Sequence, residues 1–125
     1  MTLIDITVTL AVAGILASVA LPSYQAQMAQ ARRAEAITAL TQVQALQEQF
    51  RAHHGSYALQ LSGLTGLVPR GTHYGVSLVA GHAQGYIANA RLLDGSTRDA
   101  GCAELTLSVL DGVATHGPTE RCWNR

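Results

Sequence analysis

A run of uncharged, apolar residues near the start of the chain constrains the fold more than any other feature. Residues 6–21 are mainly Ile, Val, Leu and Ala. With their neighbours they reach the roughly 20 residues that span a bilayer as a helix. No Lys or Arg precedes the run, so it lacks the basic segment of a cleavable signal peptide. We therefore expect a retained anchor, with a buried core helix as the alternative.

The rest of the chain is long enough for one small head. The 125 residues are 48% hydrophobic and only 13% charged, and the formal net charge is zero. All eight basic residues are Arg and none is Lys, and eight acids balance them. Such totals do not by themselves indicate nucleic-acid binding. We expect an anchor over residues 1–24 and a globular head over residues 25–125.

A single carboxylate, Asp5, lies at the edge of the apolar run. A charge at membrane depth is costly unless it has a partner. The nearest cation in the sequence is the α-amino group of Met1, about 6 Å away along a helix that rises roughly 1.5 Å per residue. Asp5 could therefore contact the α-amino group of its own chain or that of a neighbouring chain.

The residues after Pro22 predict that the helix continues into the head. They are rich in Ala, Gln, Leu, Arg and Glu and contain no Gly or Pro before Gly55, so one helix should run to about His53. An apolar stripe that should pack on a sheet is formed by Ala36, Ile37, Ala39, Leu40, Val43, Leu46 and Phe50. The residues that we assign mostly to other faces are Gln42, Gln44, Gln47, Glu48, Gln49 and Arg51.

Three later stretches show the alternation of apolar and polar residues that is typical of strands. They cover residues 73–80, 85–93 and 102–110, and their close spacing favours an antiparallel meander. A turn at Asp111 and Gly112 would allow a fourth, edge strand over residues 113–117. The connection before the first strand should contain one short helical turn. A helix packed on one antiparallel sheet places the chain in the α+β class.

The string TLIDITVTLAVAGILASVALPSYQ resembles the amino terminus of type IV pilins. That family starts with an aromatic residue, followed by Thr-Leu-Ile-Glu, an apolar helix and a Pro-Ser-Tyr ending. Met1 stands where the family has Phe, and Asp5 stands where it has Glu. The matching residues are Thr2, Leu3, Ile4, Gly14, Ile15, Leu16, Pro22, Ser23 and Tyr24. The resemblance implies the pilin fold, a long N-terminal helix on a small antiparallel sheet.

The same resemblance implies roles for residues of the anchor. Asp5 would pair with the α-amino group of an adjacent subunit during assembly, and it would thereby set the axial register, because an unpaired buried charge is costly. The chain would be the mature form, with N-methylation on Met1. We also expect irregular backbone somewhere in residues 14–23, between Gly14 and Pro22, because Pro22 cannot donate to the carbonyl of Ser18.

Two further groups of residues can each be interpreted in more than one way. Arg32, Arg33 and Glu35 form either a solvated face or salt bridges to neighbouring subunits, with attraction to anionic lipid before assembly. Cys102 and Cys122 could form a disulfide, two free thiols or half of a metal site, and a head outside the cytosol favours the disulfide. The pairs GC and CW around them also resemble the C-terminal disulfide loop of pilins.

No pattern in the sequence indicates catalysis, a metal or a cofactor. The familiar nucleophile, metalloprotease and nucleotide-binding motifs are absent, so we do not expect an enzyme. The histidines are too scattered for a metal motif: His53, His54, His73, His82 and His116. The arginines that could form a DNA-binding stripe, as in minor pilins that serve as DNA-uptake receptors, are Arg70, Arg91, Arg98, Arg121 and Arg125. The acids that interleave with them are Asp94, Asp99, Glu104 and Glu120.

The leading hypothesis from the sequence is a structural subunit of a type IV pilus. It would be a homopolymer of pilin subunits, held in the inner membrane before the pilus assembly machinery adds it to a filament on the bacterial surface. It would support adhesion, twitching motility or DNA uptake. The alternatives are a minor pilin that binds DNA for natural transformation and a pseudopilin of type II secretion.

Overall fold

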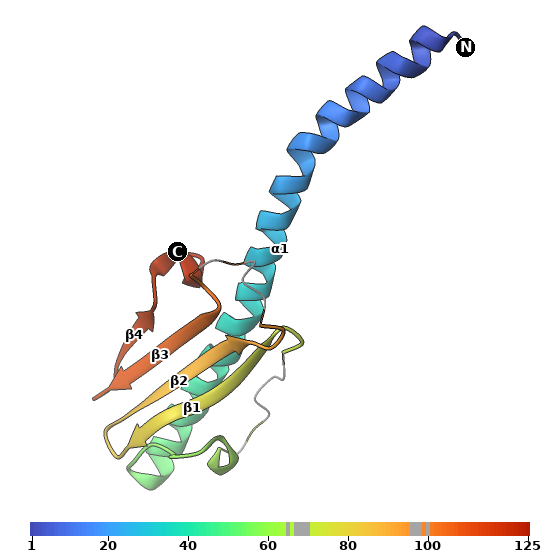
Figure 1. Ribbon diagram of the computed structural model, residues 1–125. Helices are drawn as coiled ribbons and strands as arrows, with labels where there is room; N and C mark the ends of the chain where they lie inside the picture. The colour runs from blue at the N-terminus through green and yellow to red at the C-terminus, as the bar shows by residue number, and fades with distance from the viewer. Residues whose placement is uncertain (65, 67–70, 96–98, 100) are drawn as a thin grey trace. The chain divides into compact units, whose positions relative to one another are not determined.

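The computed structural model describes residues 1–64, 66, 71–95, 99 and 101–125. These residues form two compact units, Met1–Gln30 and Ala31–Arg125 (Figure 1). Helix α1 (Leu3–His54) contributes residues to both units, so the single long helix that the sequence predicts is confirmed.

The first unit is a helix with an exposed apolar surface. Every large apolar side chain from Leu3 to Leu21 is at least half exposed, and none of the apolar segment is buried within the chain. By length and composition α1 could cross a membrane. A surface of this kind fits membrane anchoring, because lipid or other apolar helices would remove it from water.

The irregular backbone expected over residues 14–23 is not found in the single chain. Helix α1 is continuous through Gly14 and Pro22. Pro22 deletes one backbone hydrogen bond, but the turns on both sides keep theirs and are rich in the good helix formers Ala and Leu. Gly14 costs only about 1 kcal/mol relative to Ala. A helix break in an assembled filament stays a prediction.

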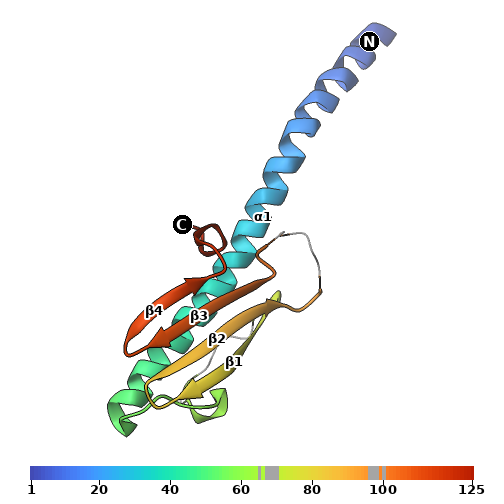
Figure 2. The same cartoon turned by 60° about the vertical axis from the view of Figure 1, so that its left-hand side comes forward.

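The second unit contains a four-stranded antiparallel sheet in the order β1-β2-β3-β4, a simple meander (Figure 2). The strands are β1 (Tyr74–His82), β2 (Gly85–Leu92), β3 (Glu104–Leu110) and β4 (Val113–Gly117). The three predicted strands and the predicted edge strand are therefore confirmed. The short helical turn predicted before them is the 3-10 helix η1 (Leu61–Gly63), and a second one, η2 (Glu120–Trp123), ends the fold.

Two tight hairpins set the register of the sheet. Strand β1 runs two residues beyond the predicted Ala80, so that His82 pairs with Gly85 across a two-residue turn. Leu110 pairs with Val113 in the same way. In that second turn Asp111 and Gly112 have φ of 51° and 82°, and a positive φ at both central residues is what a type I′ hairpin turn requires.

One face of the sheet packs on the apolar stripe of α1. Alternate residues of β2 and β3 are buried, as expected for a sheet with one solvated face. The predicted stripe is confirmed, with Ile37 and Phe50 only partly buried at its margin. The main contributors from the helix and these two strands are Ala36, Leu40, Val43, Leu46, Tyr86, Ala88, Ala90, Leu92, Leu105, Leu107 and Val109.

Gln47 departs from the prediction, because it is fully buried rather than on a solvated face of the helix. Its Nε2 donates to the carbonyl oxygen of Ala58 at 3.0 Å, and its Oε1 accepts from the Ala58 amide at 2.8 Å. Both polar ends of the buried amide are thus satisfied by backbone, as buried polar groups require. Gln47 fixes the chain that follows α1 against the helix.

Candidate functional site

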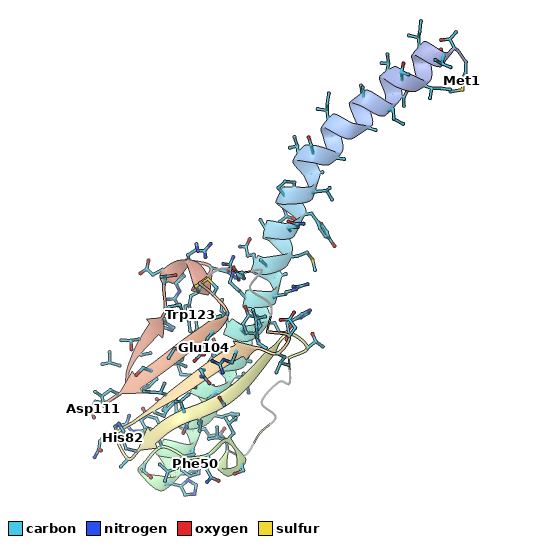
Figure 3. All side chains as sticks on the ribbon, viewed as in Figure 1. Met1, Phe50, His82, Glu104, Asp111 and Trp123 are labelled. Atoms are coloured by element: carbon cyan, nitrogen blue, oxygen red, sulfur yellow. A yellow bond between two sulfur atoms is a disulfide. The ribbon has the colours of Figure 1, made fainter. Side chains whose placement is uncertain are left out.

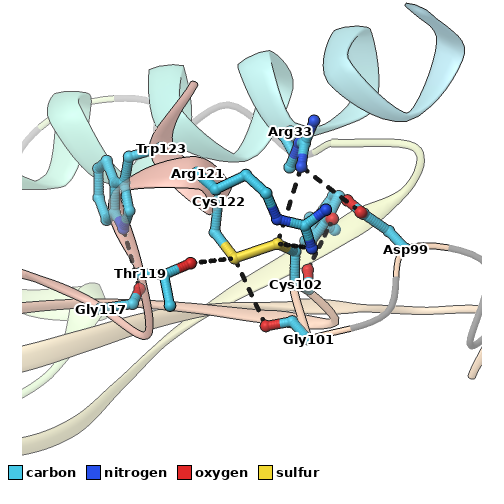
Figure 4. Close-up of a disulfide and its surroundings, with 10 residues drawn as sticks. Arg33, Asp99, Gly101, Cys102, Gly117, Thr119, Arg121, Cys122 and Trp123 are labelled. Atoms are coloured by element: carbon cyan, nitrogen blue, oxygen red, sulfur yellow. Dashed lines mark hydrogen bonds and ion pairs between the residues drawn. A yellow bond between two sulfur atoms is a disulfide. The ribbon is translucent and has the colours of Figure 1, made fainter. Parts of the chain in front are cut away.

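The C-terminal end of the chain is tied to the sheet by a disulfide. Cys102, just before β3, is bonded to Cys122 in η2, and both residues are buried. This confirms the expected bond and excludes free thiols, since the chain has no other cysteine. Two guanidinium groups approach the sulfur of Cys102: Arg33 Nη1 at 3.7 Å and Arg121 Nη2 at 3.5 Å (Figure 4).

Arg33 also has an acidic partner within its own chain. Its Nη1 lies 3.5 Å from Oδ1 of Asp99, and both side chains are about nine-tenths buried. The second carboxylate oxygen of Asp99 and the Nε atoms of Arg32 and Arg33 are buried without a hydrogen-bond partner among the described residues. The head therefore holds Arg33 in place before any neighbouring subunit is present.

Glu35 joins α1 to the residues that precede β1. It accepts hydrogen bonds from the backbone amide of His73 at 3.1 Å and lies 2.9 Å from His73 Nδ1. Partial burial raises the pKa of Glu35, but the hydrogen bonds and the charge of His73 outweigh burial and lower it overall. A Cβ at position 71 would collide with Glu35, so this contact requires Gly71. Salt bridges from Arg32, Arg33 and Glu35 to other subunits stay a prediction.

The segment after β4 packs around Trp123. The indole Nε1 donates to the carbonyl of Gly117 at 2.9 Å, and the ring of His116 lies edge-on at 4.4 Å between centroids. Burial, and then the charge of Arg125, lower the pKa of His116. The exposed residues Arg121 and Arg125 lie two positions before and two positions after this buried indole.

Most of the described arginines lie near the disulfide. Arg91 belongs to the same end of the sheet, because it pairs with Glu104, two residues after Cys102. Figure 3 shows Trp123 and Glu104 toward this end and Asp111 toward the other. Arg51, on the contrary, bonds to Tyr57 and lies beside Gly112 in the distant β3-β4 turn. The arginines near the disulfide are Arg32, Arg33, Arg91, Arg121 and Arg125.

Only three of the five arginines in the predicted stripe are among the described residues. Arg91, Arg121 and Arg125 are exposed, and Arg70 and Arg98 lie outside the described residues. Acidic residues interleave with the described arginines, as the sequence indicates. Among the described residues no group of three His, Cys, Asp or Glu side chains is placed to hold a metal ion.

A row of polar side chains crosses the solvated face of the sheet near Arg91. Ser77 donates to Asn89, whose Nδ2 donates to Glu104 Oε1 at 2.7 Å. Arg91 Nε lies 3.3 Å from the other oxygen, Oε2. Sequence reasoning identified Arg91 and Glu104 only as interleaved charges. The period-two alternation of both strands was the signal that they share a face.

In the first unit, Asp5 has a partner that sequence reasoning missed. Its Oδ2 accepts from the amide of Thr2 at 3.0 Å and from the Thr2 hydroxyl at 2.8 Å, while the Asp5 amide donates back to that hydroxyl at 3.4 Å. This is a reciprocal capping box, which satisfies donors at the helix start. The partner of Asp5 within the single chain is thus Thr2 rather than the α-amino group of Met1, and the Thr-x-x-Asp spacing was the available signal.

The comparison with protein families adds to this geometry. A family model described as "Type IV minor pilin ComP, DNA uptake sequence receptor" matches residues 22–106. The match runs from Pro22 in α1 through β1 and β2 into β3, which is more than half of the chain. No curated protein matches the sequence. The long helix on an antiparallel sheet, the disulfide and this match agree, and the chain is a type IV pilin that belongs to the ComP minor pilin family.

Proposed function

We propose that this protein is a minor pilin whose head binds double-stranded DNA and whose N-terminal segment joins a type IV pilus. The family match over residues 22–106 carries the proposal, since it covers most of the head and its description is that of a DNA uptake receptor. The pilus would present the head on the cell surface, where DNA from the surroundings can reach it.

The chemistry of the basic residues supports this proposal. Every basic side chain is an arginine, and all eight arginines follow residue 30. A planar guanidinium can donate two parallel hydrogen bonds to a phosphate or to a guanine edge, whereas a lysine ammonium binds a phosphate mainly as a point charge. The exposed residues Arg91, Arg121 and Arg125 are placed on a sheet and on a disulfide-anchored segment, so they are oriented before DNA arrives.

The balanced charge of the head sets an expectation for affinity. Binding that depends on a few phosphate contacts falls with salt by about one power of concentration for each contact. With acids among the arginines, non-specific attraction should be weak. Discrimination between DNA sequences would then come from contacts to base edges rather than from net charge.

The experiment that tests DNA binding uses the full chain in non-ionic detergent micelles. Fluorescence anisotropy with a labelled duplex should show binding at low salt that weakens as salt increases. Arg121→Gln combined with Arg125→Gln should reduce the salt slope by about two, one for each lost phosphate contact. Arg51→Gln is the control of equal chemistry at the other end of the sheet. Absence of binding at low salt would contradict the proposal.

Sequence preference is tested with the same complex. Unlabelled fragments of the genome that encodes the protein should compete better than unrelated DNA of equal length and base composition. Equal competition by both would leave a general DNA-binding pilin and would remove the receptor role for a particular uptake sequence.

Incorporation into the pilus is proposed to depend on Asp5. The Oδ2 atom of Asp5 accepts hydrogen bonds from Thr2, and the apolar segment of α1 is not buried within the chain. An α-amino group of an adjacent subunit would offset the charge that packing between apolar helices removes from water. Asp5→Ala should therefore reduce the share of the protein found in sheared pili, and Asp5→Glu should retain it. Normal incorporation of Asp5→Ala would refute the pairing.

A major-subunit role in adhesion or twitching motility is the second candidate. The exposed apolar surface of the first unit favours assembly with many like helices, which a major or a minor pilin would need equally. Quantitative mass spectrometry of purified pili separates the two roles. A minor pilin should be a small fraction of the filament, and a homopolymer should consist almost entirely of this chain.

A further inference from the structure

The polar row on the solvated sheet face has a directed order of hydrogen bonds. Ser77 lies opposite Asn89 in the β1-β2 register, and Arg91 lies opposite Glu104 in the β2-β3 register. The Ser77 hydroxyl donates to Asn89 Oδ1, and this turns the Asn89 Nδ2 group toward Glu104. Glu104 therefore accepts a hydrogen bond from Asn89 at Oε1 and forms an ion pair with Arg91 at Oε2.

Stability alone is a weak reason for this arrangement. The side chain of Arg91 is 77% exposed and that of Glu104 is 38% exposed. Exposed ion pairs contribute only about 0–1 kcal/mol, because water screens the charges and both side chains lose conformational freedom. The row joins three strands that backbone pairing already holds together, with one irregularity in β1 between Leu78 and Ala80. The polar row is therefore better explained by its effect on the orientation of the Arg91 side chain.

We propose that Glu104 is a positioning residue, which holds Arg91 so that its terminal amino groups contact a DNA phosphate. This inference rests on the proposed function. Glu104 engages Arg91 through Nε, the atom nearest the stem of the guanidinium. The side chain of Arg91 is 77% exposed, so the outer edge of the guanidinium, formed by its two terminal nitrogens, can be reached by a phosphate.

The neighbours of the pair make this orientation specific. Asn89 Nδ2 donates to the carboxylate oxygen of Glu104 that does not face Arg91, and this bond restricts the rotation of the carboxylate. A phosphate then meets a guanidinium whose conformation is already restricted, and less conformational freedom is lost on binding. Arg91 lies at the same end of the sheet as Arg121 and Arg125, so one duplex backbone can extend across that end.

We expect removal of Glu104 to weaken DNA binding, whereas simple electrostatics predicts that removing an acid strengthens it. An acid that only repels DNA should strengthen binding when it is removed. Glu104→Ala removes a negative charge but releases Arg91, so we expect affinity for a duplex to fall about threefold to tenfold. Glu104→Gln has a single amide oxygen for the two donors, Asn89 Nδ2 and Arg91 Nε, so it should retain only part of the affinity.

The experiment measures anisotropy of a labelled duplex with the full chain in non-ionic detergent micelles over a series of salt concentrations. Arg91→Gln should weaken binding to a similar extent as Glu104→Ala. Both variants should lower the salt slope by about one, the signature of one lost phosphate contact. In the Arg91→Gln background, Glu104→Ala should cause no further loss. Unchanged thermal unfolding would show that the fold is intact.

Glu120→Ala is the matched control, because it removes an exposed acid from η2 at the same end of the head. It should raise affinity slightly or leave it unchanged. If the wild type binds DNA and Glu104→Ala strengthens binding as Glu120→Ala does, the positioning role is overturned while the proposed function stands. If neither the wild type nor any variant binds DNA, the proposed function and this inference are both overturned.

Discussion

Gln47 shows how one polar side chain can fix a segment of the head. Among the described residues it is the polar residue that lies in the core, where both ends of its amide bond to Ala58. Gln47→Ala would leave a buried N–H and a buried carbonyl unsatisfied and would open a cavity. We expect the free energy of unfolding to fall by about 2–4 kcal/mol.

The neighbouring exposed residue provides the control for this prediction. Gln49→Ala removes an identical side chain from the same turn of α1, where it is exposed, and should change stability by about 0.5 kcal/mol or less. Thermal unfolding followed by the near-ultraviolet signal of the aromatic residues measures both. Equal losses in the two variants would show that the Ala58 bonds contribute nothing.

For single residues, the sequence indicated which charged side chain was unusual but did not reveal its hydrogen-bond partners. Asp5 was evident as a lone charge at the edge of an apolar run, but its bonds to Thr2 depend on the exact start of the helix. Gln47 looked like its neighbours Gln44 and Gln49, because nothing in a helical pattern reveals that a later loop returns to it. Polar residues in cores are set by tertiary contacts, which single-sequence patterns do not contain.

The contact between α1 and the residues that precede β1 includes an ionised group, Glu35. The pKa of Glu35 lies below its ordinary value of 4.5 when the chain is folded, so the folded form holds fewer protons than the unfolded form near that pH. The contribution of Glu35 is therefore fully present above about pH 4.5 and is lost as pH falls through the lowered pKa.

The lowered pKa of Glu35 predicts how the stability of a Glu35 variant depends on pH. Glu35→Gln should lower the melting temperature at pH 6, because a charged acceptor is lost from the His73 amide. The gap between wild type and variant should narrow steadily as the pH is lowered from about 5 to 3. Melting curves at a series of pH values provide the measurement. A gap that is constant over this range would show that the carboxylate is not ionised in the contact.

The elements themselves were more predictable than their ion pairs. The four strands follow from alternation and from turn residues, which are local signals. The partners of Arg33 and Glu35 lie 66 and 38 positions away along the chain, so the sequence could not choose between pairing within the head and pairing between subunits. The structure places Asp99 and His73 beside them, which only the assembled fold could reveal.

The disulfide ties the C-terminal segment of the head to the start of β3, at the end where most of the described arginines lie. Cys102→Ser combined with Cys122→Ser should lower the free energy of unfolding by about 3 kcal/mol in the chain-entropy model for a loop of this size. The same variant should bind DNA more weakly, because Arg121 and Arg125 would lose their anchored segment. Denaturation and anisotropy measure the two effects, and full DNA affinity would contradict the second. A reducing agent acts on no other bond, since these are the only cysteines.

For the molecule as a whole, the family was predictable from the sequence, and the proposed DNA role was less so. The pilin resemblance comes from the first two dozen residues, whereas the family model matches residues 22–106. The net charge is zero, yet five of the described arginines lie at the same end of the head, near the disulfide. Composition averages over the surface, and only the register of the strands and the disulfide show which charges lie together.

The exclusive use of arginine for positive charge offers a route to mapping the DNA contact. An α-dicarbonyl reagent modifies guanidinium groups, so one reaction on these 125 residues reports on every basic side chain. Without DNA the rate should follow accessibility, with the exposed Arg91 modified well before the buried Arg33. Protection of Arg91, Arg121 and Arg125 by duplex, read by mass spectrometry, would outline the footprint of the nucleic acid at single-residue resolution.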